Sequence, residues 1–220
     1  MQDDRFITQV CEDLRASHAA HTILLYGSHA DGSASADSDY DLAAFAPIDT
    51  SFRIARVVQG RYLDAFVYPE ALLLAPDEDL LKLREGRVLL ERGSAGRALL
   101  NRLDAIYARG PTPLPADEIE ARKVWAHKML ARMTRGDAEG HYRRVWLLWA
   151  LLEDYFHLRG QWYEGPKRAL RWLLQADPQT HDAMRLALAP NASDEAIASL
   201  VHRVVGDVDA ASSTTDRQTR

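Results

Sequence analysis

Residues 24 to 42 (LLYGSHADGSASADSDYDL) hold the residue types that bind phosphate and divalent metal ions. An apolar run ends in Gly27 and Ser28, and after ten further residues Asp39 and Asp41 open a second apolar run. Alternate side chains of a β-strand point to the same face, so Asp39 and Asp41 are predicted to project together, about 7 Å apart along the backbone. Two carboxylates at this separation can share divalent cations.

The acidic residues lie at the start of elements that are expected to be buried. Asp41 leads directly into residues 42 to 45 (LAAF), and buried charge is costly unless a counterion such as Mg²⁺, which prefers oxygen ligands, balances it. A third acid, Asp64, is the one charged residue in the alternating run of residues 62 to 68 (YLDAFVY). Asp64 therefore stands out on a neighbouring predicted strand.

The order of Gly-Ser, Asp-x-Asp and a later single Asp, over residues 20 to 70, resembles the nucleotidyltransferase superfamily that includes DNA polymerase β and the aminoglycoside nucleotidyltransferases. The resemblance implies that Gly27 and Ser28 hold a nucleoside triphosphate. It also implies that Asp39 and Asp41 ligate two Mg²⁺ ions.

In the same comparison, Asp64 completes the metal site facing the attacking hydroxyl. One departure is His29, because many relatives have Arg after the Gly-Ser pair. The resemblance therefore predicts a Mg²⁺-dependent enzyme of the nucleotidyltransferase type, with a nucleoside triphosphate such as ATP as its substrate.

The chain is long enough, at 220 residues with 47% hydrophobic residues, for a catalytic domain and a second domain. The Pro-rich segment GPTPLPADE (110–118) is the expected linker. We predict an α+β protein: a small mixed-sheet nucleotidyltransferase domain at 1–110, an all-α helical bundle domain at 111–206 and a disordered tail at 207–220.

Hydrophobic periodicity places the expected elements along both halves. In the first half, strands are expected at 22–26, 39–46, 61–68 and 87–91, a short ambiguous element at 53–58, and helices at 4–20, from 77 and at 93–107. In the second half, helices are expected at 118–134, 138–158, 167–174, 178–188 and 193–205.

Charge is distributed unevenly. The net charge is −5, yet the segment 121–171 has eleven Lys or Arg against five Asp or Glu. A basic helical half could neutralise triphosphate, and Lys167 is the expected donor because no Lys or Arg lies between Arg15 and Arg53. The overall pI of about 5.9 argues against a general nucleic-acid binder and favours a small or local substrate.

Aromatic and acidic residues mark the second half. Trp146 and Trp149 have helical spacing and are expected in the core, whereas Tyr163 and Lys167, in the turn QWYEGPK, are expected to be exposed, stacking on a base and contacting phosphate. Glu153 is the candidate general base because it lies in an apolar helix that can raise its pKa. Its neighbour Asp154 is a second candidate, and the structural alternative for both acids is an ion pair with one of four cations: Arg143, Arg144, Lys167 or Arg168.

Other features exclude classes of protein. The single cysteine, Cys11, excludes an internal disulfide and a cysteine-based zinc site. No run of about 18 apolar residues is present, and the first twenty residues are unlike a signal peptide. A cytoplasmic protein without a membrane partner is expected.

The preferred function is transfer of a nucleoside monophosphate from a triphosphate to a hydroxyl of a small, aminoglycoside-like acceptor. Two alternatives stay open: an RNA or protein acceptor, as in toxin and antitoxin systems, and a nucleotide-binding module without turnover. The residues do not identify the acceptor, the preferred base or the oligomeric state.

Overall fold

The computed structural model describes residues 2–207 and the side chains from Arg5 onward. The chain divides into two compact units between Arg109 and Gly110. The first unit contains a mixed five-stranded sheet with helices, and the second contains helices alone, so the predicted α+β class is confirmed. Positions 208–220 of the predicted disordered tail lie outside the described residues. No helix within residues 2–207 is long and apolar enough to cross a membrane.

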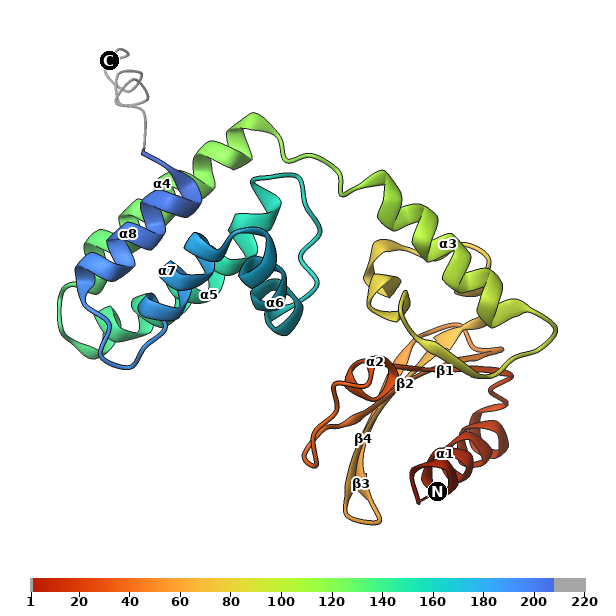
Figure 1. The fold of residues 1–220 in the computed structure, drawn as a ribbon. Coiled ribbons are helices and arrows are strands. Elements are labelled where there is room, and N and C mark those ends of the chain that lie inside the picture. Colours follow the sequence, from red (N-terminus) through yellow and green to blue (C-terminus); the bar gives the residue numbers. More distant parts are fainter. Residues whose placement is uncertain (1, 208–220) are drawn as a thin grey trace, which may run out of the picture. The chain divides into compact units, whose positions relative to one another are not determined.

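The first unit is built around the sheet (Figure 1). Its elements are α1 (Gln2–His18), β1 (Thr22–Tyr26), α2 (Ser28–Asp31), β2 (Tyr40–Ala46), β3 (Phe52–Val58), β4 (Arg61–Pro69), the 3-10 helices η1 (Glu70–Leu73) and η2 (Glu78–Leu83), β5 (Arg87–Leu90) and α3 (Ala95–Arg109). The strand order is β3-β4-β2-β1-β5. Strands β2 and β4 are parallel, and the other neighbours are antiparallel.

Helix α1 covers one face of this sheet. Its buried Phe6, Val10 and Leu14 belong to one apolar cluster with inward-facing strand residues such as Leu42 and Ala65. On the opposite face lie η1, η2 and α3, where Leu80, Leu83, Leu99 and Leu103 are buried (Figure 1). The two faces carry alternate residues of each strand, as a pleated sheet requires.

Two expected elements differ from the structure. The ambiguous segment 53–58 is the edge strand β3, which pairs along its whole length with β4. Its residues are mostly exposed, which explains the weak alternation in its sequence. The helix expected from residue 77 is a short 3-10 helix, η2, which spans only Glu78–Leu83.

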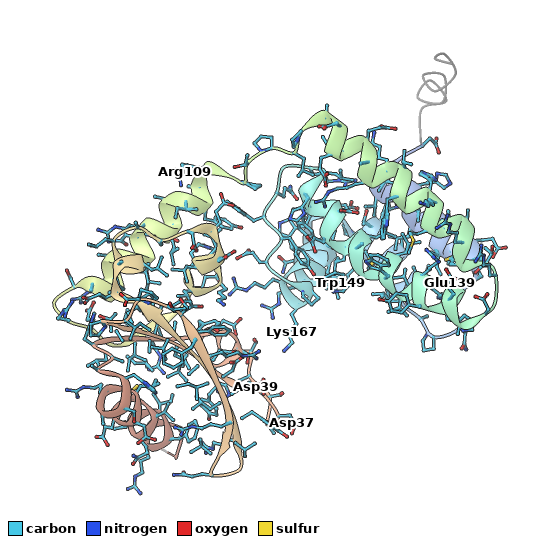
Figure 2. All side chains as sticks on the ribbon, turned by 180° about the vertical axis from the view of Figure 1, so that it is seen from behind. Asp37, Asp39, Arg109, Glu139, Trp149 and Lys167 are labelled. Atoms are coloured by element: carbon cyan, nitrogen blue, oxygen red, sulfur yellow. The ribbon has the colours of Figure 1, made fainter. Side chains whose placement is uncertain are left out.

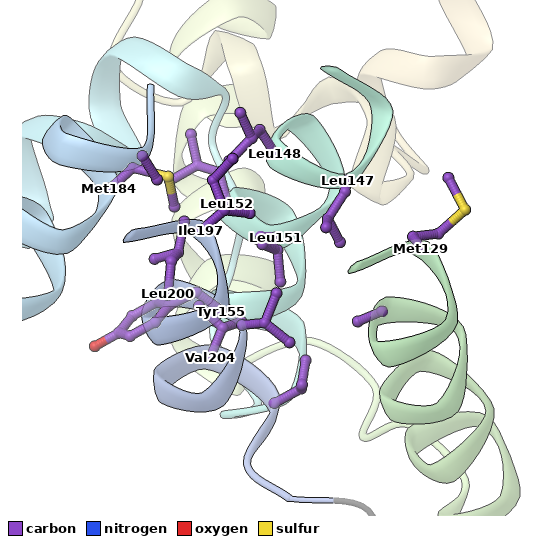
Figure 3. Close-up of a cluster of buried hydrophobic side chains, with 14 of the residues drawn as sticks. Met129, Leu147, Leu148, Leu151, Leu152, Tyr155, Met184, Ile197, Leu200 and Val204 are labelled. Carbon is purple, nitrogen blue, oxygen red and sulfur yellow. The ribbon is translucent and has the colours of Figure 1, made fainter. Parts of the chain in front are cut away.

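The second unit consists of five helices within the described residues. They are α4 (Ala116–Met133), α5 (Ala138–His157), α6 (Pro166–Ala176), α7 (Pro178–Ala187) and α8 (Asp194–Val205). One apolar cluster joins them, and Figure 3 shows Met129 from α4, Leu151 from α5, Met184 from α7 and Leu200 from α8 within it.

The expected core positions of Trp146 and Trp149 are wrong. Trp146 is 45% exposed and Trp149 is 63% exposed. The core face of α5 is instead formed by leucines, among them Leu147 and Leu151, which are fully buried. Helical spacing places the two tryptophans on a common face, but burial depends on which face the neighbouring helices cover.

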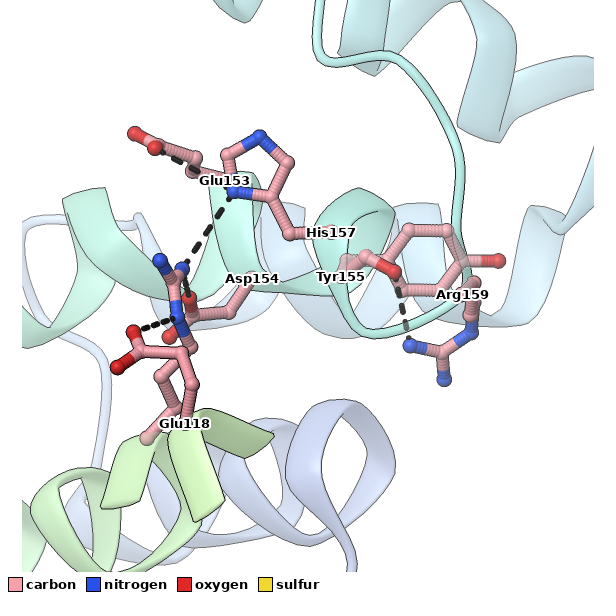
Figure 4. A network of polar contacts seen from close by, with 7 residues as sticks. Glu118, Glu153, Asp154, Tyr155, His157 and Arg159 are labelled. Atoms are coloured by element: carbon pink, nitrogen blue, oxygen red, sulfur yellow. Dashed lines mark hydrogen bonds and ion pairs between the residues drawn. The ribbon is translucent and has the colours of Figure 1, made fainter. Parts of the chain in front are cut away.

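A buried ion pair joins α4 to α5. Arg122 Nη1 donates to Asp154 Oδ1 over 2.6 Å, and Arg122 Nε donates to Glu118 Oε1 over 2.8 Å (Figure 4). The Asp154 side chain is only 6% exposed, and burial raises its pKa even though Arg122 acts in the opposite direction. The sequence-based partners for this acid were therefore wrong, because its partner is Arg122.

We expect Arg122→Ala to lower the free energy of unfolding by about 2–3 kcal/mol, because it leaves the Asp154 carboxylate buried without its cation. Urea unfolding followed by circular dichroism measures this change. The control is Arg135→Ala, whose i,i+4 pair with Glu139 lies on the surface and is expected to change stability by less than about 0.5 kcal/mol. Equal losses in the two variants would contradict the structural importance of the buried pair.

Candidate active site

Two of the candidate carboxylates lie side by side on the sheet. Asp41 of β2 is in direct register with Asp64 of the parallel strand β4. Residues in register on neighbouring strands point to the same face, with the strands about 4.8 Å apart. Tyr26 of β1 is in register with Asp41 on the other side. The row Tyr26, Asp41 and Asp64 lies on the face opposite α1.

The turn after β1 places backbone against this acidic pair. Gly27 has φ 69°, a conformation that glycine adopts without steric strain. A Cβ atom at Gly27 would overlap Oδ2 of Asp41, so the backbone approaches the carboxylate more closely than any other residue would allow. The structure thus brings Gly27, Asp41 and Asp64 together, although they are spread over nearly forty residues.

The other candidates of the motif lie beside this group. Ser28 is half-buried and is the first residue of α2. Asp39 is exposed and precedes β2, which begins at Tyr40, one residue later than expected. Figure 2 shows Asp37 and Asp39 on the segment that leads into this strand. His29 stacks on Tyr40 with ring centroids 3.8 Å apart, which gives it a structural role.

Arg53 forms a two-pronged ion pair with Asp64. Arg53 Nε donates to Asp64 Oδ1 and Arg53 Nη2 donates to Asp64 Oδ2, each over 2.7 Å. This hydrogen-bonded pair raises the pKa of Arg53. The Asp64 side chain is 17% exposed and the Arg53 side chain is 59% exposed. Arg53 therefore approaches from the solvent side and occupies both oxygens of the carboxylate.

Lys82 of η2 supplies a second cation on this face. Its Nζ lies 4.1 Å from the ring centroid of Phe66, and within about 6 Å of those of Tyr26 and Tyr68. Partial burial against these rings lowers the pKa of Lys82, while the charges of Asp64, Asp79 and Asp41 act in the opposite direction. The ammonium group thus lies in the electrostatic field of both site carboxylates.

The two tyrosines beside Lys82 are held neutral. Burial raises the pKa of Tyr26, and the Asp41 carboxylate raises it further. Burial also raises the pKa of Tyr68 to about 12. Near neutral pH, both rings therefore keep their hydroxyl protons and act as polar, uncharged walls of the site.

The types of residue at this site suit a hard divalent cation. Asp41 and Asp64 offer carboxylate oxygens, which Mg²⁺ prefers, and Gly27, because it has no Cβ, lets Oδ2 of Asp41 lie directly against its backbone. Within residues 2–207, no three His, Cys, Asp or Glu side chains are grouped so that they could hold a metal ion. The assignments of Asp39, Asp41 and Asp64 as metal ligands stay predictions.

The remaining candidates belong to the second unit. Glu153 Oε1 lies 3.5 Å from Nδ1 of His157 (Figure 4), and its side chain is 32% exposed. Tyr163 is not an exposed loop residue, because its ring packs against Phe156 at 6.0 Å and against the helical core. Lys167 is exposed at the first turn of α6. Their participation in the site stays a prediction.

Arg53 and Lys82 are the residues that sequence reasoning missed. The sequence predicted Lys167 of the second unit as the cation because no Lys or Arg lies near the Gly-Ser turn, but Arg53 and Lys82 of the first unit lie beside the acidic pair. One signal was available for Arg53. It lies within a segment that a hairpin would pair with the strand of Asp64, and an arginine on an edge strand can reach a carboxylate on its neighbour.

No protein-family model and no curated protein matches this sequence. The chain is similar in structure to a nucleotidyltransferase-like protein from Exiguobacterium sibiricum 255-15. The TM-score is 0.41 and the sequence identity is 13%, and the match covers 91% of this chain and 77% of that chain.

Proposed function

We propose that this protein is a Mg²⁺-dependent nucleotidyltransferase that moves a nucleoside monophosphate from a nucleoside triphosphate to a hydroxyl group. The observation that carries the proposal is the placement of Asp41 and Asp64 in register on parallel strands, with the backbone of Gly27 against Asp41. Carboxylates beside an open backbone turn can hold the metal-bound phosphates of a nucleotide.

In this proposal the reaction breaks a phosphoanhydride bond and forms a phosphoester bond. The acceptor oxygen bonds to the α-phosphorus, the bond to the β-phosphate oxygen breaks, and pyrophosphate leaves with that electron pair. The hydroxyl proton passes to a general base, for which Glu153 is the predicted residue. Mg²⁺, when bound, would neutralise phosphate charge and stabilise the leaving pyrophosphate.

The chain's own residues position the reactants. Asp41 and Asp64, with Asp39, would hold two cations, and Gly27 with Ser28 would let the triphosphate approach the backbone. Arg53 has to release at least one oxygen of Asp64 before that oxygen can bind a cation. Its exposed guanidinium would then be available to a phosphate oxygen.

Lys82 is proposed to bind the triphosphate from within the first unit. We expect Lys82→Met, which keeps most of the apolar stem, to raise the KM for triphosphate about tenfold with a smaller effect on kcat, because a ground-state phosphate contact is removed. Steady-state kinetics with varied triphosphate measures both constants. The matched control is Arg87→Met. Arg87 lines a cavity with Ile7 and Cys11 of α1, so it lies on the α1 side of the sheet and not on the face of the acidic pair.

If Lys82→Met and Arg87→Met have the same KM, Lys82 does not contact the phosphates. Lys167→Ala is measured in the same assay, because Lys167 is the residue that the sequence predicts to contact the phosphates. Tyr163 is proposed to stack on the nucleotide base. If it does, Tyr163→Leu lowers the affinity for triphosphate, because the substitution removes the aromatic ring.

The proposed donor is ATP, and the proposed acceptor is a small aminoglycoside-like molecule. Full-length protein is incubated with Mg²⁺ and each of the α-³²P-labelled triphosphates, together with aminoglycosides, lincosamides, RNA or protein. Label on a small hydroxyl compound is the expected result. Label on RNA or protein alone would replace the acceptor, and no label on any compound would favour a binding module without turnover.

A further inference from the structure

Helix α5 presents an exposed aromatic stripe. Tyr142, Val145, Trp146 and Trp149 have the i, i+3, i+4, i+7 spacing of one helix face, and they are 68%, 68%, 45% and 63% exposed. Trp125 of α4 lies edge-on to Trp146, with ring centroids 5.3 Å apart. Contiguous exposed apolar patches of this kind mark binding surfaces. Figure 2 labels Trp149 on this helix.

The surface beside the stripe is basic. Lys128 and Arg132 follow Trp125 by about one and two helical turns on the same face of α4, and Lys128 is exposed. Residues 121–149 hold seven Lys or Arg against two Asp or Glu. Helices α4 and α5 pack side by side, and Arg143 Nη1 contacts Met129 Sδ across them at 3.6 Å.

The two acidic residues of this segment already form contacts within the second unit. Asp137 caps α5 by accepting a hydrogen bond from the backbone of Gly140, and Glu139 pairs with Arg135 and Arg143. Lys128 and Arg132, on the Trp125 face of α4, make no ion pair with any residue from 5 to 207. This face of α4 and α5 therefore combines planar apolar rings with uncompensated positive charge.

We propose that the aromatic stripe of α5 and the adjoining cations of α4 bind single-stranded nucleic acid. Unpaired bases stack on exposed Trp and Tyr rings, and Lys128 and Arg132 neutralise backbone phosphates. A second copy of this chain is the weaker fit, because a two-fold interface would bring the same uncompensated cations together. This inference concerns the second unit alone and does not depend on the proposed transfer reaction.

The test measures binding of fluorescently labelled oligo(U) and oligo(A) RNA of about 12 nucleotides to the full-length protein by anisotropy, with duplex RNA in parallel. Single strands are expected to bind, more weakly as salt rises. Trp149→Ala and Tyr142→Ala are each expected to weaken binding about tenfold, because each removes a stacking ring. The matched control is Trp172→Ala, which removes a tryptophan of α6 that is 40% exposed.

Lys128→Met and Arg132→Met extend the test to the charges. Each is expected to reduce the slope of log Kd against log salt by about one, because each removes one phosphate contact. Unchanged circular dichroism spectra check that each variant is folded. Absence of binding at about 50 mM salt, or equal weakening in Trp149→Ala and Trp172→Ala, would overturn the proposal. So would a dimer in light scattering that Trp149→Ala dissociates, since the stripe would then bind a second copy.

Discussion

Replacing Asp41 or Asp64 with Asn is expected to lower nucleotidyl transfer by at least about 100-fold while the protein stays folded. Each substitution keeps the shape of the side chain and removes one negative charge from the pair that lies in register on β2 and β4. Asp39→Asn is expected to act in the same way, because the proposed metal site uses all three carboxylates. Turnover of labelled triphosphate, with circular dichroism as a check of folding, measures the effect.

The matched control for these variants is Asp37→Asn. Asp37 is exposed and, like Asp39, lies on the segment that leads into β2 (Figure 2). It is expected to keep near-normal turnover because it has no role in the proposed site. Near-normal turnover in Asp41→Asn or Asp64→Asn would show that the affected carboxylate does not hold the catalytic cations.

Gly27→Val is expected to weaken triphosphate binding at least tenfold and to reduce turnover further. A side chain at Gly27 would overlap Oδ2 of Asp41, so the carboxylate would have to move away from the turn. The positive φ of this residue adds backbone strain of about 1–3 kcal/mol. Titration of triphosphate against the variant gives the affinity, and Ser28→Ala is expected to be milder.

Gly206→Val separates these two effects. Gly206 has φ 72° and ψ −167°, close to φ 69° and ψ −155° at Gly27, but a Cβ at Gly206 meets no atom within 4 Å. The two variants therefore share the backbone strain, and only Gly27→Val disturbs Asp41. Equal triphosphate affinity in the two variants would remove the Gly27 turn from the site.

The local sequence was sufficient to predict the part of the candidate site that the hairpin of β1 and β2 forms. Gly27 and Asp41 lie at facing ends of β1 and β2, so the motif could be read from a single stretch of chain. Asp64 was also recognisable, because a lone charge interrupts an alternating apolar run. The pairing of Asp41 with Asp64 follows from the parallel register of β2 and β4, which the sequence does not state.

The sequence does not specify contacts that depend on strand register or on the packing of one element against another. Arg53 reaches Asp64 only because β3 and β4 pair in one particular register, and Lys82 reaches the same face through the packing of η2. Arg122 is 32 positions from Asp154, and nothing local links them. Trp149 was misplaced for a related reason: periodicity defines a helix face, but packing decides whether that face is covered.

The most direct test of the account is binding of Mn²⁺, as a substitute for Mg²⁺, in the presence of a non-hydrolysable triphosphate. Electron paramagnetic resonance counts the bound ions in the parent protein and in Asp41→Asn and Asp64→Asn. We expect about two bound Mn²⁺ ions per chain in the parent and a loss of binding in both variants. Equal Mn²⁺ binding in all three proteins would contradict the claim that Asp41 and Asp64 hold the metal-bound nucleotide.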